Sequence, residues 1–62
     1  MTYKVWQLRT AKGYSLRELE ELSGVSKTTI NSIENGRANP TMETLLRLAK
    51  ALDVELSALF EL

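Results

Sequence analysis

The connection between two helical patterns constrains this chain more than any other feature. Apolar residues recur at helical spacing from residue 16 and again from residue 30, and only the short run Leu22-Ser-Gly-Val-Ser26 joins the two patterns. Two helices joined by so few residues cannot lie antiparallel side by side, so they must cross at a steep angle. Gly24 offers a position that tolerates a positive φ, and Val25 is predicted to fill the corner from inside.

Capping residues and glycines mark the other helix boundaries. Ser15 and Glu18 form a capping-box pattern, Ser26 is a second N-cap, and Thr41 opens a further helix. Strand signals are nearly absent. We therefore predict an all-α fold, a compact five-helix bundle in a single domain of residues 1–62, with helices at about 4–12, 15–24, 26–36, 41–52 and 56–61.

Composition removes several classes of site. The chain has no cysteine and no histidine, which excludes zinc sites built on these residues and Ser-His or Cys-His nucleophile pairs. Glu18, Glu20 and Glu21 cluster, but no nucleophile or metal ligand accompanies them. We therefore predict no enzyme, no metal, no cofactor and no small-molecule ligand. No apolar run is long enough to span a membrane and no signal peptide is visible, so we expect a cytoplasmic protein.

Eight basic and eight acidic residues cancel, so any basic surface has to be local. In helix 26–35 we expect Ile30 and Ile33 to point inward. The outward residues are short, polar and nearly free of acid: Lys27, Thr28, Asn31 and Ser32. The major groove of DNA accepts such a face, because Lys donates to guanine, Asn pairs with adenine and Thr contacts the thymine methyl group.

From about residue 5 to residue 60 the chain resembles the phage repressor/Cro-type helix-turn-helix domains of Xre-like bacterial regulators. No single motif carries this resemblance; it rests on several motifs in a fixed order, which together cover most of the chain. They are Arg9-Thr-Ala-Lys-Gly13, Ser15-Leu-Arg-Glu-Leu19, Ser23-Gly-Val-Ser-Lys-Thr-Thr-Ile30, Ile33-Glu-Asn-Gly-Arg37, Asn39-Pro40 and Thr44-Leu-Leu-Arg-Leu-Ala-Lys-Ala-Leu52.

The resemblance implies sequence-specific binding of double-stranded DNA and regulation of transcription, as a repressor, with helix 26–35 in the major groove. It places base contacts on Lys27, Thr28 and Ser32, with Asn31 beside them. It places phosphate contacts on the backbone at Leu16 and on Arg17, Thr29, Asn35 and Arg37. Arg9 and Glu34 become a structural ion pair between the first and third helices. It also implies a homodimer on its operator, with half-sites about 10 base pairs apart and candidate dimer contacts at Phe60 and Leu62.

Two residues depart from the family's pattern. A glutamine often stands where this chain has Leu16, so here only the backbone can contact phosphate. An alanine is favoured where Glu20 stands, because the two helices pack closely there. We expect the Glu20 side chain to bend outward or to find a cation such as Arg17 or Lys50.

Other functions stay open beside DNA binding. The same fold could serve as a protein-interaction module of the antitoxin type, which the neutral net charge and the acidic second helix favour. Such a module would not need Lys27, Thr28 and Arg37. The chain could also be a plain helical bundle or the DNA-binding fragment of a larger regulator.

Overall fold

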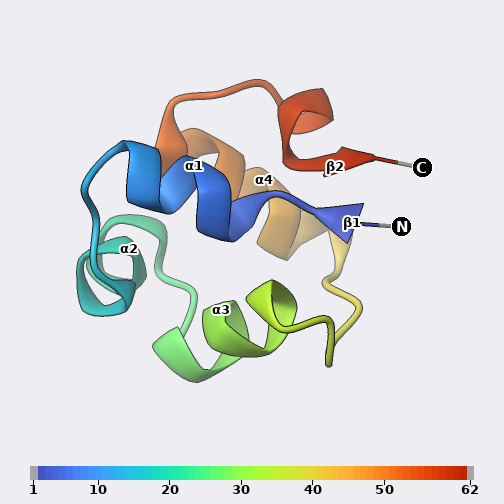
Figure 1. Cartoon of the computed structure of the whole chain (residues 1–62), viewed down its shortest axis with the longest axis horizontal. Helices are drawn as coiled ribbons and strands as arrows, with labels where there is room; N and C mark the ends of the chain where they lie inside the picture. The colour runs from blue at the N-terminus through green and yellow to red at the C-terminus, as the bar shows by residue number, and fades with distance from the viewer. Residues whose placement is uncertain (1, 62) are drawn as a thin grey trace.

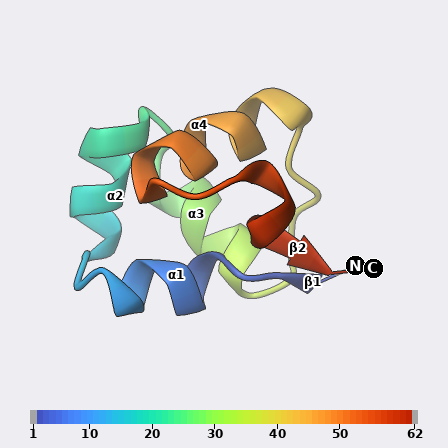
Figure 2. The ribbon, with the colours of Figure 1, turned by 90° about the horizontal axis from the view of Figure 1, so that it is seen from above.

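The computed structural model describes residues 2–61. Over this range the chain forms four α-helices, one 3-10 helix and a two-stranded sheet (Figure 1). Viewed from above, α1 and α4 lie on opposite sides of the molecule and α2 crosses one end (Figure 2). The elements in order are β1 (Thr2–Tyr3), α1 (Val5–Ala11), α2 (Leu16–Ser23), α3 (Lys27–Glu34), α4 (Met42–Leu52), η1 (Leu56–Leu59) and β2 (Phe60–Glu61).

The predicted five-helix bundle is wrong at the two ends of the chain. Residues 56–59 form a 3-10 helix, and Phe60–Glu61 leaves the expected fifth helix to pair antiparallel with Thr2–Tyr3. The backbone N–H of Lys4 donates to the carbonyl oxygen of Leu59 at 2.6 Å and extends this pairing. Strands of two residues are too short to show an alternating pattern in the sequence, which is why the sheet was not predicted. Phe60 is half-buried, and Leu62 lies outside the described residues.

The predicted helix caps are confirmed. Ser15 Oγ accepts the Glu18 N–H at 3.0 Å, and Glu18 Oε1 accepts the Ser15 N–H at 2.9 Å, which completes the capping box. Ser26 and Thr41 each cap the helix that follows through the same kind of side-chain bond. These bonds satisfy N–H groups that have no partner within the helix, so each helix begins where the sequence places its cap.

One buried cluster holds the helices together, and every α-helix contributes to it. Leu19 of α2 and Ile30 of α3 are completely buried, and Val25 in the turn between them is 7% exposed. The predicted filling of the corner by Val25 is therefore confirmed. Leu48 and Leu52 close the cluster from α4. Among residues 2–61, no helix combines the length and the apolar character that crossing a membrane requires.

An ion pair links the residue that follows β1 to the last residue of β2. Lys4 Nζ lies 2.7 Å from Glu61 Oε1, and the hydrogen bond from Lys4 lowers the pKa of Glu61 below its ordinary value. A carboxyl group whose pKa is lowered by folding stabilises the folded form above its unfolded pKa. That contribution is lost as the pH falls through the lowered value.

We expect acidification below the ordinary pKa of a glutamate to loosen the pairing of β1 with β2 before the helices unfold. The measurement is the hydrogen-exchange protection of the Lys4 amide, corrected for its intrinsic rate. The Glu61→Gln variant should show weaker protection with no such pH dependence. A wild-type chain whose protection does not change on acidification would contradict the role given to this pair.

Candidate nucleic-acid interface

Helix α3 turns an apolar face toward the core and a polar face toward solvent. Ile30 is 0% and Ile33 2% exposed. The inward direction predicted for both isoleucines is therefore confirmed. The rest of the helix surface carries the residues predicted to contact bases: exposed Lys27, Thr28 and Asn31, and half-buried Ser32. These four side chains thus come from one rigid element, which fixes their spacing.

The first turn of α3 is fixed by Ser26. Its hydroxyl oxygen accepts the N–H of Thr29 at 3.2 Å and donates its proton to Thr29 Oγ1 at 2.9 Å. Thr29 is half-buried and still has its own hydroxyl proton to donate. A phosphate contact from Thr29 is therefore chemically available.

Two asparagines brace each other on the outer side of α3. Asn35 Nδ2 donates to the Asn31 backbone oxygen at 2.8 Å and to Asn31 Oδ1 at 3.0 Å. These bonds orient the Asn31 amide and leave its Nδ2 group and one lone pair of Oδ1 for another partner. Such an amide can donate and accept at once, as contact with adenine requires. Sequence reasoning did not reveal this brace.

Arg37 is placed by the way α3 ends. The N–H of Arg37 donates to the Ser32 oxygen at 2.8 Å, and the N–H of Gly36 donates to the Ile33 oxygen at 3.2 Å. This pair of bonds is a Schellman motif, and Gly36 adopts the positive φ of 71° that the motif needs. The exposed Arg37 side chain therefore lies in the turn that follows α3.

Helix α2 presents backbone donors at its start. The Leu16 side chain packs against the buried cluster. The N–H groups of Leu16 and Arg17 have no hydrogen-bond acceptor within residues 2–61. A helix N-terminus with unpaired N–H groups attracts anions. The predicted backbone contact at Leu16 thus has its donor in place, and the Leu16 side chain has a structural reason to be apolar.

Glu20 has a partner that was not predicted. Its Oε2 accepts the backbone N–H of Lys27 at 3.0 Å, so the expected bond to a cation is wrong. This contact brings one face of α2 against the start of α3. Arg17 stands three residues before Glu20 and therefore lies on the same face of α2.

Arg9 joins three segments behind this surface. Its Nε and Nη2 atoms donate to the Glu34 carboxylate at 2.7 and 3.0 Å, and Nη1 donates to the Tyr14 carbonyl oxygen at 2.9 Å. The two charged side chains are only 12% and 5% exposed. The hydrogen bonds to Glu34 raise the pKa of Arg9, although burial opposes the shift. The bidentate contact holds α3 in a fixed position against α1.

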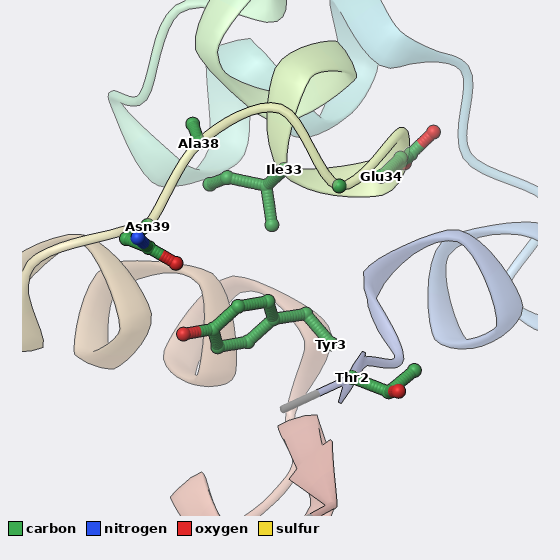
Figure 3. A pocket seen from close by; sticks show the side chains of 7 residues that line it. Thr2, Tyr3, Ile33, Glu34, Ala38 and Asn39 are labelled. Carbon is green, nitrogen blue, oxygen red and sulfur yellow. The ribbon is translucent and has the colours of Figure 1, made fainter.

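A small hollow of about 170 Å³ lies between β1 and the chain that follows α3 (Figure 3). Tyr3 points its ring into this hollow, across from Ile33. Glu34 lines it too, but its carboxylate is already bound by Arg9. Within residues 2–61, no cluster of three or more acidic side chains could hold a metal ion.

A family model described as helix-turn-helix matches residues 7–59. The chain belongs to the helix-turn-helix family. The resemblance inferred from its sequence motifs is thereby confirmed. Over 59 residues the chain is 41% identical to the HTH-type transcriptional regulator SinR of Bacillus subtilis, covering 94% of this chain. It spans only 53% of the length of SinR.

Solved helix-turn-helix structures share the fold as well. The restriction-modification controller protein C.AhdI from Aeromonas hydrophila is 40% identical and superimposes with a TM-score of 0.88, covering 92% of this chain and 86% of that protein. SinR in complex with DNA, described as the master regulator for biofilm formation, is 41% identical with a TM-score of 0.85. That match covers 94% of each chain. The four-helix arrangement with its small sheet is thus that of a transcriptional-regulator domain.

The ion pairs show which charged side chains are already engaged within the domain. Three acidic residues are bound to cations: Glu61 to Lys4, Glu43 to Arg47, and Glu34, at the end of α3, to Arg9. Glu18 and Glu20 accept backbone N–H groups instead. Arg17, Lys27 and Arg37 have no ion-pair partner within residues 2–61. The uncompensated positive charge therefore includes all three cations that the sequence assigns to DNA.

We expect Arg9→Ala to destabilise the domain by about 3–5 kcal/mol, because it leaves the buried Glu34 carboxylate without its partner. A chain of this length has only a few kcal/mol of stability in total. The midpoint of thermal unfolding should therefore fall steeply.

Arg47→Ala is the matched control. Arg47 pairs with Glu43 at 3.0 Å, but these side chains are 52% and 76% exposed. Its loss should cost less than about 1 kcal/mol. Equal and small changes in the two variants would contradict a structural role for the Arg9–Glu34 pair.

Proposed function

We propose that this chain binds double-stranded DNA at a specific sequence and regulates transcription, with α3 in the major groove. The observation that carries this proposal is the outer face of α3, where Lys27, Thr28 and Asn31 are exposed and Asn31 is held by Asn35. Each is a residue type that can distinguish base edges in the major groove. The membership of the chain in the helix-turn-helix family supports the same conclusion.

The contacts divide into two kinds. Lys27, Thr28, Asn31 and Ser32 contact base edges and give specificity. The phosphate contacts fix the register of the domain on the duplex without selecting a sequence. They come from the Leu16 backbone and from Arg17, Thr29, Asn35 and Arg37.

As a repressor this protein acts in the cytoplasm as a homodimer, with one α3 in each of two successive major grooves. A two-fold-symmetric pair of domains then requires an operator whose half-sites lie about 10 base pairs apart. Binding weakens as salt rises, because cations on the DNA backbone are released when Arg17, Lys27 and Arg37 approach the duplex.

The direct test is selection from a randomised pool of duplexes with the wild-type chain near 50 mM salt. The proposal predicts a recovered site with two-fold symmetry. A single half-site would support DNA binding and contradict the dimer. A folded chain that recovers no site would contradict DNA binding and favour a protein partner.

Lys27→Ala is expected to relax the preference for one base pair and to cost about 1–3 kcal/mol at the recovered site, because a bidentate base contact is lost. Affinity for that site and for a duplex changed at that base pair gives the comparison. Equal preference in variant and wild type would remove Lys27 from the base contacts.

Arg37→Ala should weaken binding to all sequences alike and reduce the salt slope by about one unit, because one phosphate contact is lost. Lys50→Ala is the matched control, since Lys50 is an exposed cation on α4. It should change neither quantity. A loss confined to one sequence in Arg37→Ala would assign Arg37 to base contact instead.

A further inference from the structure

Glu20 closes the turn between α2 and α3 from both sides. Its backbone oxygen accepts the N–H of Gly24 at 2.9 Å, at the end of α2. Its side-chain Oε2 accepts the N–H of Lys27 at 3.0 Å, at the start of α3. One residue therefore ties the last turn of one helix to the first residue of the next.

This contact also changes which donors α3 can offer. The first N–H groups of a helix have no partner within the helix. In α3 the Lys27 N–H is taken by Glu20 and the Thr29 N–H by Ser26. A free helix N-terminus attracts any phosphate, whatever the sequence. In this chain two of those N–H groups are satisfied internally, which leaves more of the contact with DNA to side chains.

We infer that Glu20 is a positioning residue that determines the base specificity of α3. Its bond to the Lys27 N–H fixes the direction of the first turn, and with it the projection of Lys27 and Thr28. The carboxylate also withholds a sequence-independent donor from the DNA backbone. This inference rests on the proposed function, since it concerns specificity at the same surface.

The role differs from that of a residue needed for folding. Glu20 is half-buried, whereas Leu19, Val25 and Ile30 fill the corner and the Arg9–Glu34 pair holds α3 against α1. Loss of the Glu20 side chain therefore leaves the crossing of the helices in place. It frees only the Lys27 N–H at the start of α3, while Ser26 still holds Thr29.

The experiment compares Glu20→Ala and Glu20→Gln with the wild-type chain. The amide oxygen of glutamine can still accept the Lys27 N–H, whereas alanine cannot. The readout is the ratio of the dissociation constants for the recovered duplex and for a duplex changed at the base pair that faces Lys27. Glu20→Ala should reduce this discrimination about fivefold, as expected for the loss of one helix cap. Glu20→Gln should retain it.

Two further measurements separate the bond from charge and from folding. Glu21→Gln removes a neighbouring exposed carboxylate and should leave discrimination unchanged. Hydrogen exchange of the Lys27 amide should quicken in Glu20→Ala and stay slow in Glu20→Gln, while the Leu19 amide stays protected in both variants.

Three results would overturn the inference alone. The first is a Glu20→Ala variant that discriminates between the two duplexes as well as the wild type. The other two are a Glu20→Gln or a Glu21→Gln variant that loses as much discrimination as Glu20→Ala. A wild-type chain that recovers no site would overturn the proposed function, and this inference with it.

Discussion

The steep crossing of α2 and α3 is the constraint on which the rest of this structure depends. The three residues between α2 and α3 cannot return the chain alongside α2, so α3 must leave the turn at an angle. Leu19, Val25 and Ile30 fill the inner side of that angle and belong to one buried cluster. Because the apolar side of α3 is buried in this corner, its polar side faces solvent. The candidate interface is thus a consequence of how the core closes.

Ion pairs and one carboxylate–backbone bond hold the elements of this arrangement in place. Glu34, Glu43 and Glu61 are bound to cations, and Glu20 is bound to the backbone at the start of α3. The buried Arg9–Glu34 pair fixes where α3 lies relative to α1. A chain with equal numbers of acids and bases can therefore carry an uncompensated basic surface, because charge balance is a property of the whole and binding is local.

Local chemistry made much of the fold predictable. The caps at Ser15, Ser26 and Thr41 and the glycine at position 36 depend on neighbours within a few residues, and those neighbours are visible in the sequence. The corner role of Val25 followed from the length of the connection. The family motifs supplied the residues of the interface.

Contacts set by tertiary geometry were beyond the sequence. The two-residue strands pair across almost the whole length of the chain and show no periodicity. The Glu20 carboxylate can accept the Lys27 N–H only because the start of α3 lies close to α2. The sequence does not show this distance, and it suggested a cation as the partner instead. The brace between Asn35 and Asn31 is different, because it joins residues four apart and their helical spacing could have predicted it.

The central claim is that α3 and the start of α2 form the surface that meets DNA. Amide chemical shifts, followed as the folded chain is titrated with a duplex recovered by selection, test this most directly. We expect large shifts at Arg17, Lys27, Thr28, Asn31 and Arg37, with small shifts along α4. Shifts concentrated on α4, or none at saturating duplex, would contradict it.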